Sequence, residues 1–346
     1  MKYFATLFWL VLSTTLTPAQ PTGQIFEFEF EGVVLNGVLN LPPEGPPKGI
    51  VVLVHGSGST NAVAQDWHAD VRATLVAAGY GTCMWDKMGC GQSGGTFDYK
   101  HPVQNSAAEV MAAFDALRRL GGDGSEVIGL WGISRAGWIN PLVIAQRPDI
   151  AFWISVSGVD DKENFKYLLA ENLKLNGHPP DSVDRIVGEW AVGVRITHSG
   201  GSFETYLAAT TALRQNPFFR RFTGNTEISE AGYYAYQQKF SKVTLDEATG
   251  LEVCIPGFDS LLARIDCPVL AFFGEQDKNV DWTQTRALYE RCLGERADLT
   301  VRSFPACNHN MFQCETGGFY EHEDDQLPYV RCTGFLETMA DWLEER

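Results

Sequence analysis

The sequence of 346 residues is long enough for one large domain, or for a core domain with an insertion. Its 45% hydrophobic and 12% aromatic residues are typical of a globular protein and exclude a disordered chain. The formal net charge of -16, without any run of Lys or Arg, argues against a nucleic-acid partner and against an anionic membrane surface as partner.

Residues 1–19 have the pattern of a secretory signal peptide. Lys2 precedes an apolar segment, and the small residues Thr17 and Ala19 suit cleavage after Ala19. An uncleaved anchor is the alternative, but the apolar run is short for a bilayer span and no later run is longer. We therefore expect a secreted or periplasmic protein without stable membrane insertion.

The eight cysteines contain no C-x-x-C pair, which argues against a zinc ribbon and against a thioredoxin-like redox pair. In an oxidising compartment an even number of cysteines permits disulfides, but the spacing leaves their pairing open. Buried free thiols are the alternative, above all for Cys83, which lies inside an apolar run.

Apolar periodicity then predicts a sheet flanked by helices. The first two segments after the signal, IFEFEFEG and VVLNGVLNLP, alternate apolar and polar residues and predict an antiparallel pair of strands at the sheet edge. Later apolar runs alternate with helical segments, which indicates an α/β fold with a mostly parallel, twisted sheet. The predicted strands are GIVVLVHG, YGTCMWD, EVIGLWGIS, IAFWISVSG, CPVLAFFG and LTVRSFPA, and the helices include QDWHADVRATLVAAG, NSAAEVMAAFDALRRL, AGWINPLVIAQ and TQTRALYERCL.

Residues 161–258 break this alternation, with helix-like segments and many aromatic residues. A segment of this length between two strands predicts an inserted helical cap over the carboxyl ends of the strands, where it would wall an apolar substrate pocket. In the alternative, which we expect for more than half of these aromatic residues, they form only the core of the cap itself. The predicted division is a signal peptide at 1–19, a core at 20–160 and 259–346, and a cap at 161–258.

Ser134 lies in LWGISRAGW, between a predicted strand and a predicted helix. A strand-to-helix turn that exposes a serine Oγ is strained and crowded, so the residues two before and two after the serine must be small. Gly132 meets this requirement, and Ala136 stands where the G-x-S-x-G pattern has its second glycine. Ala136 is still small, and we interpret Ser134 as a nucleophile on this turn.

The segment VHGSGS, residues 54–59, follows an earlier predicted strand. Such a loop directs backbone N–H groups toward a developing oxyanion, and Ser57 is our choice of donor, with the N–H of Arg135 as the second. We interpret His55 as a structural hydrogen-bonding residue and not as the catalytic base. The Arg135 side chain is predicted either to pair with a carboxylate of the protein or to contact substrate.

Two further residues follow strands near the end of the chain. Asp277 lies in FFGEQDKNV, where Glu275 and Asp281 are near rivals, and His309 lies in PACNHNMF. The order Ser134, Asp277, His309 is that of α/β-hydrolase triads. The remaining histidines lie in predicted helix, loop or cap and do not follow a strand: His68, His101, His178, His198 and His322.

The G-x-G-x-x-G run from Gly89 to Gly94 resembles a dinucleotide-binding motif. No helix follows it directly, because TFDYKHPVQ intervenes, and no acid stands at the expected later strand end. No spacing of His, Cys and carboxylates is typical of a metal site either. We therefore expect no cofactor and no metal.

The chain resembles the α/β-hydrolase superfamily over nearly all of its mature length, and most closely the capped esterase and serine-aminopeptidase-like branch. The motifs that carry this resemblance are HGSG, GISRAG, GEQD and NHN. The run WDKMGCGQSGG is similar to that branch's D-x-R-G-x-G-x-S loop, with Met88 in place of Arg, and GFLETMADWLEE is similar to its last helix. The resemblance implies a Ser-His-Asp mechanism and hydrolysis of an ester or related acyl bond. Two departures are Ala136 and an insertion after His309, flanked by Cys314 and Cys332, which we expect to form an acidic rim.

We interpret the protein as an exported serine hydrolase of the carboxylesterase type, acting on a small-molecule ester or other acyl substrate. One alternative is an aminopeptidase, with Asp160, Asp161 and Glu163 holding the substrate amine, although we prefer to interpret these acids as a helix N-cap and first turn. A thioesterase is a second alternative, and a non-catalytic binding protein on a hydrolase scaffold is a third. The sequence leaves the oligomeric state open.

Overall fold

A computed structural model describes residues 23–120, 127–294 and 296–346. The predicted signal peptide, residues 1–19, lies outside the described residues. No helix in these ranges is both long enough and apolar enough to cross a lipid bilayer.

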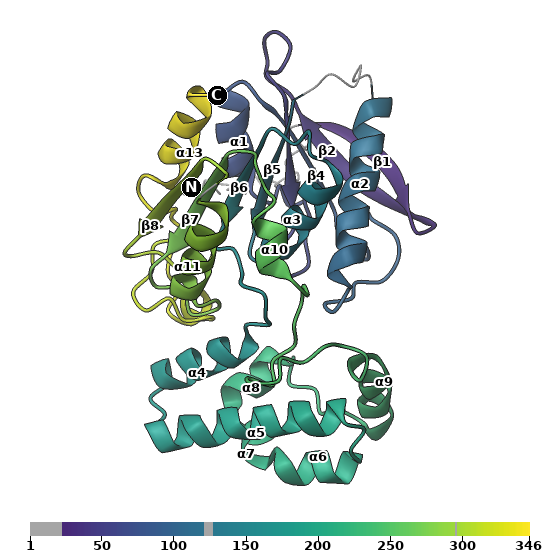
Figure 1. Ribbon diagram of the computed structural model, residues 1–346, viewed down its shortest axis with the longest axis vertical. Helices are drawn as coiled ribbons and strands as arrows, with labels where there is room; N and C mark the ends of the chain where they lie inside the picture. Colours follow the sequence, from purple (N-terminus) through teal and green to yellow (C-terminus); the bar gives the residue numbers. More distant parts are fainter. Residues whose placement is uncertain (1–22, 121–126, 295) are drawn as a thin grey trace, which may run out of the picture.

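The described residues form an eight-stranded sheet (Figure 1). Its strands are β1 (Gln24–Phe30), β2 (Val33–Asn40), β3 (Ile50–Val54), β4 (Gly81–Trp85), β5 (Ile128–Ile133), β6 (Phe152–Val156), β7 (Val269–Gly274) and β8 (Leu299–Phe304). Their order across the sheet is β1-β2-β4-β3-β5-β6-β7-β8. The pairs β1–β2 and β2–β4 are antiparallel, and all others are parallel. This confirms the predicted α/β class and the predicted antiparallel pair at the edge.

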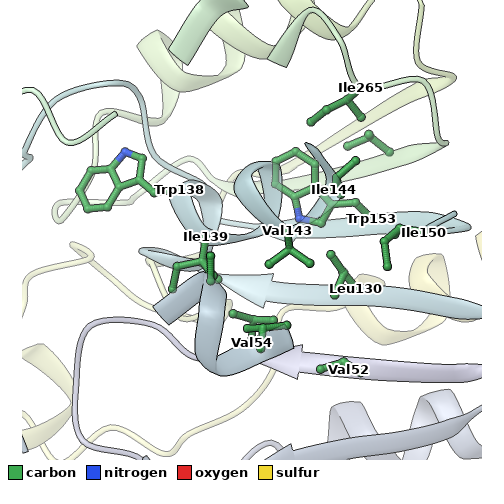
Figure 2. Close-up of a cluster of buried hydrophobic side chains, with 14 of the residues drawn as sticks. Val52, Val54, Leu130, Trp138, Ile139, Val143, Ile144, Ile150, Trp153 and Ile265 are labelled. Carbon is green, nitrogen blue, oxygen red and sulfur yellow. The ribbon is translucent and has the colours of Figure 1, made fainter. Parts of the chain in front are cut away.

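Helices cover both faces of the sheet because β3 to β7 are almost continuous runs of buried residues. One face packs on α1 (Ala69–Ala77) and α13 (Phe335–Glu344). The other packs on α2 (Val103–Arg119), α3 (Ala136–Gln146), α10 (Phe258–Leu262) and α11 (Trp282–Leu293). Figure 2 shows side chains of β3 and β5 beside those of α3: Val52, Val54, Leu130, Ile139 and Val143.

Helix α1 is shorter than predicted. It begins at Ala69, although the apolar pattern of QDWHADVRATLVAAG suits a helix from Gln65. Asp66 and His68 both have a positive φ, 53° and 54°, which is the left-handed region and interrupts a right-handed helix. The side chain of Asp66 binds the buried guanidinium of Arg72, which belongs to the first turns of α1.

A helical insertion lies between β6 and α10 and is drawn in teal and green at the bottom of Figure 1. Its entering and leaving chains pair with each other: Glu163 N donates to Glu252 O at 3.0 Å, and Cys254 N donates to Asp161 O at 3.0 Å. The predicted boundaries at 161 and 258 stay a prediction. The helices of the insertion are α4 (Phe165–Leu175), α5 (Pro180–His198), α6 (Phe203–Ala209), α7 (Thr211–Gln215), α8 (Pro217–Phe222) and α9 (Glu230–Phe240).

Aromatic residues of the insertion pack mostly on one another. The ring of Tyr233 is 1% exposed, and the rings of Phe203, Tyr206 and Tyr234 lie with their centroids 5.1 to 5.4 Å from it. Phe218 packs with leucine and isoleucine side chains of α4 and α5 in a separate buried cluster. Phe218 and Tyr233 thus lie in the core of the insertion, and the same role for most of the other rings stays a prediction.

A disulfide joins Cys307 and Cys332, whereas the six other cysteines, including the buried Cys83, are free. The disulfide closes the segment that follows β8, which contains His309 and the short helix α12 (Glu321–Asp324). Backbone hydrogen bonds reinforce the closure, including Cys332 N to Met311 O at 3.0 Å.

Removing this disulfide is expected to destabilise the protein. Because the bridge spans a sequence separation of 25, we expect Cys307→Ala with Cys332→Ala to lower the free energy of unfolding by about 3.5 kcal/mol. Urea denaturation measures this change. Cys314→Ala is the matched control, since Cys314 lies in the same segment as a free thiol. An equal loss in the control would show that the loop does not depend on the bridge.

Candidate active site

Ser134 stands at the turn between β5 and α3, with its backbone in the left-handed region at φ 56°. This conformation is costly for a non-glycine residue and persists only where the surrounding packing enforces it. Ser134 N donates to Val156 O of β6 at 2.9 Å, which fixes the turn to the neighbouring strand. The side chain of Ser134 is half-buried, as a nucleophile reached from a cleft requires.

The crowding around this turn explains the departure from G-x-S-x-G. A Cβ added to Gly132 would lie 2.5 Å from Ala136 Cβ and 2.6 Å from Asn140 Nδ2. The missing side chain at position 132 therefore provides the space that the methyl group of Ala136 occupies. Gly137, the next residue, lets the start of α3 lie close to the backbone at Val159. A Cβ added to Gly137 would lie 2.9 Å from Val159 N.

Substitutions of the two small residues that flank the serine are expected to destabilise the protein to different degrees. We expect Gly132→Ala to destabilise the protein by about 1–3 kcal/mol through overpacking and to displace Ser134. Ala136→Gly removes a methyl group without creating a clash, and we expect a loss of at most about 1 kcal/mol. Urea denaturation, together with the rate at which a fluorophosphonate labels Ser134, compares the two variants. A slower reaction of Ala136→Gly than of Gly132→Ala would contradict this account.

Asp277 and His309 form a buried pair. Asp277, 1% exposed, follows β7, and its Oδ2 lies 2.7 Å from Nδ1 of His309. Because a carboxylate only accepts hydrogen bonds, Nδ1 donates and Nε2 is left as the basic nitrogen of the neutral ring. The other carboxylate oxygen accepts the N–H groups of Asn279 at 2.8 Å and Val280 at 3.0 Å. Asp277 is therefore fixed in position and aimed at His309.

His309 reaches Asp277 because the chain after β8 turns back over the end of β7. Gln276 N donates to Cys307 O at 2.9 Å, and an added Cβ on Gly274 would lie 2.4 Å from Asn308 O. The side chain of Asn308 accepts the N–H groups of Asn310 and Phe312, which shapes the tight loop that presents the imidazole.

The two other candidate acids, Glu275 and Asp281, form hydrogen bonds away from His309. Glu275 accepts a hydrogen bond from Ser303 Oγ at 2.8 Å. Asp281 is the N-cap of α11 and accepts from Thr283 N and Gln284 N. The geometry therefore brings Asp277 to His309 and leaves Glu275 and Asp281 in structural contacts.

The loop at residues 55–59 lies against Ser134, as the sequence predicts. A Cβ added to Gly56 would lie 3.7 Å from Ser134 Cβ. Among the described residues, the backbone N–H groups of Ser57 and Arg135 donate to no protein acceptor. Free N–H groups beside the serine are what an oxyanion requires, although their role as donors stays a prediction.

The side chain of His55 differs from its predicted role, and that of Arg135 lacks the predicted carboxylate partner among the described residues, while its predicted contact with substrate stays a prediction. Neither ring nitrogen of His55 has a hydrogen-bond partner in the described part of the chain, so the interpretation as a hydrogen-bonding residue is wrong. The buried ring packs edge-on against Trp85, and burial lowers its pKa well below the usual value. Arg135 binds His101 O and, at 3.0 Å, Ser106 Oγ, so its hydrogen bonds go to neutral oxygen atoms and not to a carboxylate.

The three acids before α4 are not an N-cap and first turn. The helix begins at Phe165 with Asn164 as its N-cap residue, and Asp161 pairs with Lys162 at 2.9 Å. Only Glu163 contacts the helix start, accepting from Phe165 N at 2.7 Å. Its second oxygen has no partner among the described residues, and burial raises the pKa of Glu163 to about 7.

The insertion after His309 contacts the helical insertion. Its predicted acidic rim is partly neutralised, because Arg221 of α8 pairs with Glu323 at 2.8 Å and with Asp324 at 2.7 Å. From α4, Tyr167 donates to Asp277 O at 3.0 Å. No sequence motif pointed to Tyr167, since its contact depends on how α4 packs against the loop that follows β7.

The glycine run from Gly89 to Gly94 lies in a loop. The next helix, α2, begins only at Val103. A dinucleotide motif places its glycines at a helix N-terminus, so this geometry disfavours the nucleotide interpretation, as expected from the sequence.

Part of the chain matches a known protein family. Residues 45–173 match the family model described as serine aminopeptidase, S33. This range contains Ser134 and the loop at 55–59 but neither Asp277 nor His309. No curated protein matches the chain.

Solved structures share the fold at low sequence identity. Est1E from Butyrivibrio proteoclasticus, with bound ferulic acid, is 16% identical with a TM-score of 0.51, over 92% of this chain and 96% of that chain. Proline iminopeptidase from Mycobacterium smegmatis is 17% identical with a TM-score of 0.53, over 93% and 98%. The Pyrococcus furiosus esterase Pf2001 is 14% identical with a TM-score of 0.52, over 94% and 91%. The predicted α/β-hydrolase fold, and the resemblance to that superfamily, are confirmed.

Proposed function

We propose that this protein is an exported serine hydrolase that cleaves carboxylic esters of small molecules through Ser134, His309 and Asp277. One observation carries the proposal: a strained, half-buried Ser134 and a buried Asp277–His309 pair at 2.7 Å both follow parallel strands, at the same edge of the sheet. A binding protein has no need for all three groups. Burial of a carboxylate against an imidazole costs free energy, and a catalytic role would explain why this pair is buried nevertheless.

In the proposed mechanism, Nε2 of His309 takes the proton of Ser134 while Oγ attacks the acyl carbonyl. Asp277 holds the imidazole in the tautomer with a proton on Nδ1 and stabilises its charged form. The imidazolium then protonates the leaving alcohol, and the C–O bond of the ester breaks. Water, deprotonated by the same nitrogen, attacks the acyl-enzyme and releases the acid.

The oxyanion of each tetrahedral intermediate is proposed to bind the N–H groups of Ser57 and Arg135. Both groups are unused by protein acceptors in the described residues, and the loop of Ser57 lies against Ser134. Such donors need no reorganisation when charge develops, which is why they stabilise a transition state more than water does. No cofactor takes part in the proposed reaction.

An aminopeptidase is the second candidate, favoured by Glu163. Its carboxyl oxygen without a partner could accept a substrate amine, and the family model and one structural neighbour are named for peptidases. Against this, Lys100 acts electrostatically on Glu163, so a cation already faces this carboxyl. We therefore prefer the esterase.

Labelling with a fluorophosphonate, with site mapping by mass spectrometry, tests for an activated serine. Ser157→Ala is the matched control for Ser134→Ala, because Ser157 also follows a strand with a left-handed backbone, φ 45°, but is 1% exposed. We expect labelling at Ser134 alone. Absence of labelling in the folded protein would favour a binding protein on this scaffold.

A substrate panel then separates the enzyme classes. We expect turnover of p-nitrophenyl esters to exceed that of aminoacyl anilides and of acyl thioesters. Faster cleavage of the anilides, with a loss in Glu163→Gln, would establish the aminopeptidase instead. Faster cleavage of the thioesters would identify a thioesterase.

A further inference from the structure

The ammonium group of Lys87 is held by three consecutive backbone carbonyl groups. Its Nζ donates to Gly56 O at 2.6 Å, to Ser57 O at 3.2 Å and to Gly58 O at 2.8 Å. An ammonium has three N–H donors, so these contacts use all of them. Lys87 therefore binds the loop at 55–59, and none of the described carboxylates accepts a hydrogen bond from its ammonium group.

This contact determines where the N–H groups of the loop point. None of the described peptide bonds is cis, and in a trans peptide the C=O and N–H of one unit point in opposite directions. Because Gly56 O faces Lys87, the N–H of Ser57 faces away from it. The same relation turns the N–H groups of Gly58 and Ser59 away from Lys87. As shown above, this loop lies against Ser134.

Further contacts attach the loop to the end of β4. Lys87 N donates to Thr60 O at 3.2 Å, and Val63 N donates to Asp86 Oδ1 at 2.9 Å. A cavity of about 40 Å³ is lined by Lys87 together with Ser57 and Arg135, the two proposed oxyanion donors. Lys87 thus lines the same cavity as both proposed donors, so a change in its side chain can alter their surroundings.

We propose that Lys87 is a positioning residue for the oxyanion hole, which fixes the Ser57 N–H toward the developing charge by binding the carbonyl groups on the opposite side of the loop. The inference rests on the proposed function, because an oxyanion forms only if Ser134 attacks an acyl group. All three N–H groups of the Lys87 ammonium go to carbonyl groups of the loop, so Lys87 acts through the loop. Its effect is therefore expected in the transition state and not in ground-state binding.

The proposal also predicts a pH dependence. Burial, together with the smaller effect of the Arg135 charge, lowers the pKa of Lys87 to about 8. The ammonium is complete below this pH and is lost as pH rises through about 8, which leaves one carbonyl group without its donor. The other groups that interact electrostatically with Lys87 are Glu109, Cys90, His55 and His101.

The test compares Lys87→Met and Lys87→Arg, with Lys48→Met as matched control at an exposed position. For p-nitrophenyl butyrate, we expect Lys87→Met to lower kcat by about 100-fold, as does the loss of one oxyanion donor, with KM nearly unchanged. An alkyl boronic acid, which forms a tetrahedral adduct with the serine, should bind more weakly by a similar factor. Lys87→Arg keeps the charge at all accessible pH values, so it should restore much of kcat and remove the fall in activity above pH 8.

Unchanged kcat in Lys87→Met would overturn the proposal, as would an increase in KM alone. If Lys87→Met does not fold, as judged by circular dichroism, the pH profiles decide. A fall in kcat near pH 8 that persists in Lys87→Arg would then also overturn it. Failure of the proposed function is distinguishable, because in that case Ser134→Ala retains activity. Failure of this inference leaves Ser134→Ala inactive and Lys87→Met fully active.

Discussion

Replacing Ser134 by alanine is expected to lower kcat for p-nitrophenyl esters by about 10⁶-fold, the loss found when a serine protease loses its nucleophile. The reason is that no acyl-enzyme can form without Oγ, so only the oxyanion donors and substrate binding remain. Stopped-flow measurement of p-nitrophenol release checks this, since the burst of acylation should vanish together with steady-state turnover.

Ser157→Ala provides the comparison for that experiment. Ser157 shares the strand-end position and the positive φ of Ser134, but its buried Oγ has no hydrogen-bond partner among the described residues. We expect activity close to that of the unmodified protein. Full activity in Ser134→Ala, or equal losses in both variants, would show that Ser134 is not the nucleophile.

Changing Asp277 to asparagine is expected to lower kcat/KM by about 10⁴-fold at neutral pH. Asparagine Oδ1 can still accept the N–H groups of Asn279 and Val280, which keeps the loop intact. Its Nδ2 then donates to Nδ1 of His309, so the imidazole proton moves to Nε2. In that tautomer His309 cannot take the proton of Ser134.

Glu275→Gln is the matched control for this variant, because Glu275 lies two residues away and binds only Ser303 Oγ among the described residues. We expect a change in kcat/KM of less than about threefold, typical of a group outside the reaction. Equal losses in both variants would mean that the acid of the triad is assigned wrongly. Urea denaturation of both variants separates a loss of activity from a loss of folding.

Much of the fold follows from local patterns. Strands β3 to β7 are almost continuous runs of buried, mostly apolar residues because helices cover both faces of the sheet. Such runs can be recognised in a single sequence. The antiparallel pair β1–β2 shows the alternation of a half-exposed edge. Boundaries are less certain from sequence, as α1 shows, because the left-handed backbone of His68 depends on packing and not on helix propensity.

The proposed triad residues could be selected from the sequence because each follows a strand. The carboxyl ends of parallel strands meet at one edge, so strand order and chain order together place Ser134, Asp277 and His309 near one another. The choice of Asp277 over Glu275 could not be made in this way. It depends on the loop at 307–309 crossing the end of β7, a contact between segments about thirty residues apart.

The sequence by itself therefore determined the fold class, the chain order of the candidate residues and the small side chains two positions before and after Ser134. These depend on periodicity and on side-chain size, which are local properties. Tertiary structure alone decided the partner of Cys307, the lack of a hydrogen-bond partner for His55 among the described residues and the contact of Lys87 with three carbonyl groups. Each of these depends on the distance between atoms of separate segments, and long-range packing fixes such distances without leaving a pattern in neighbouring residues.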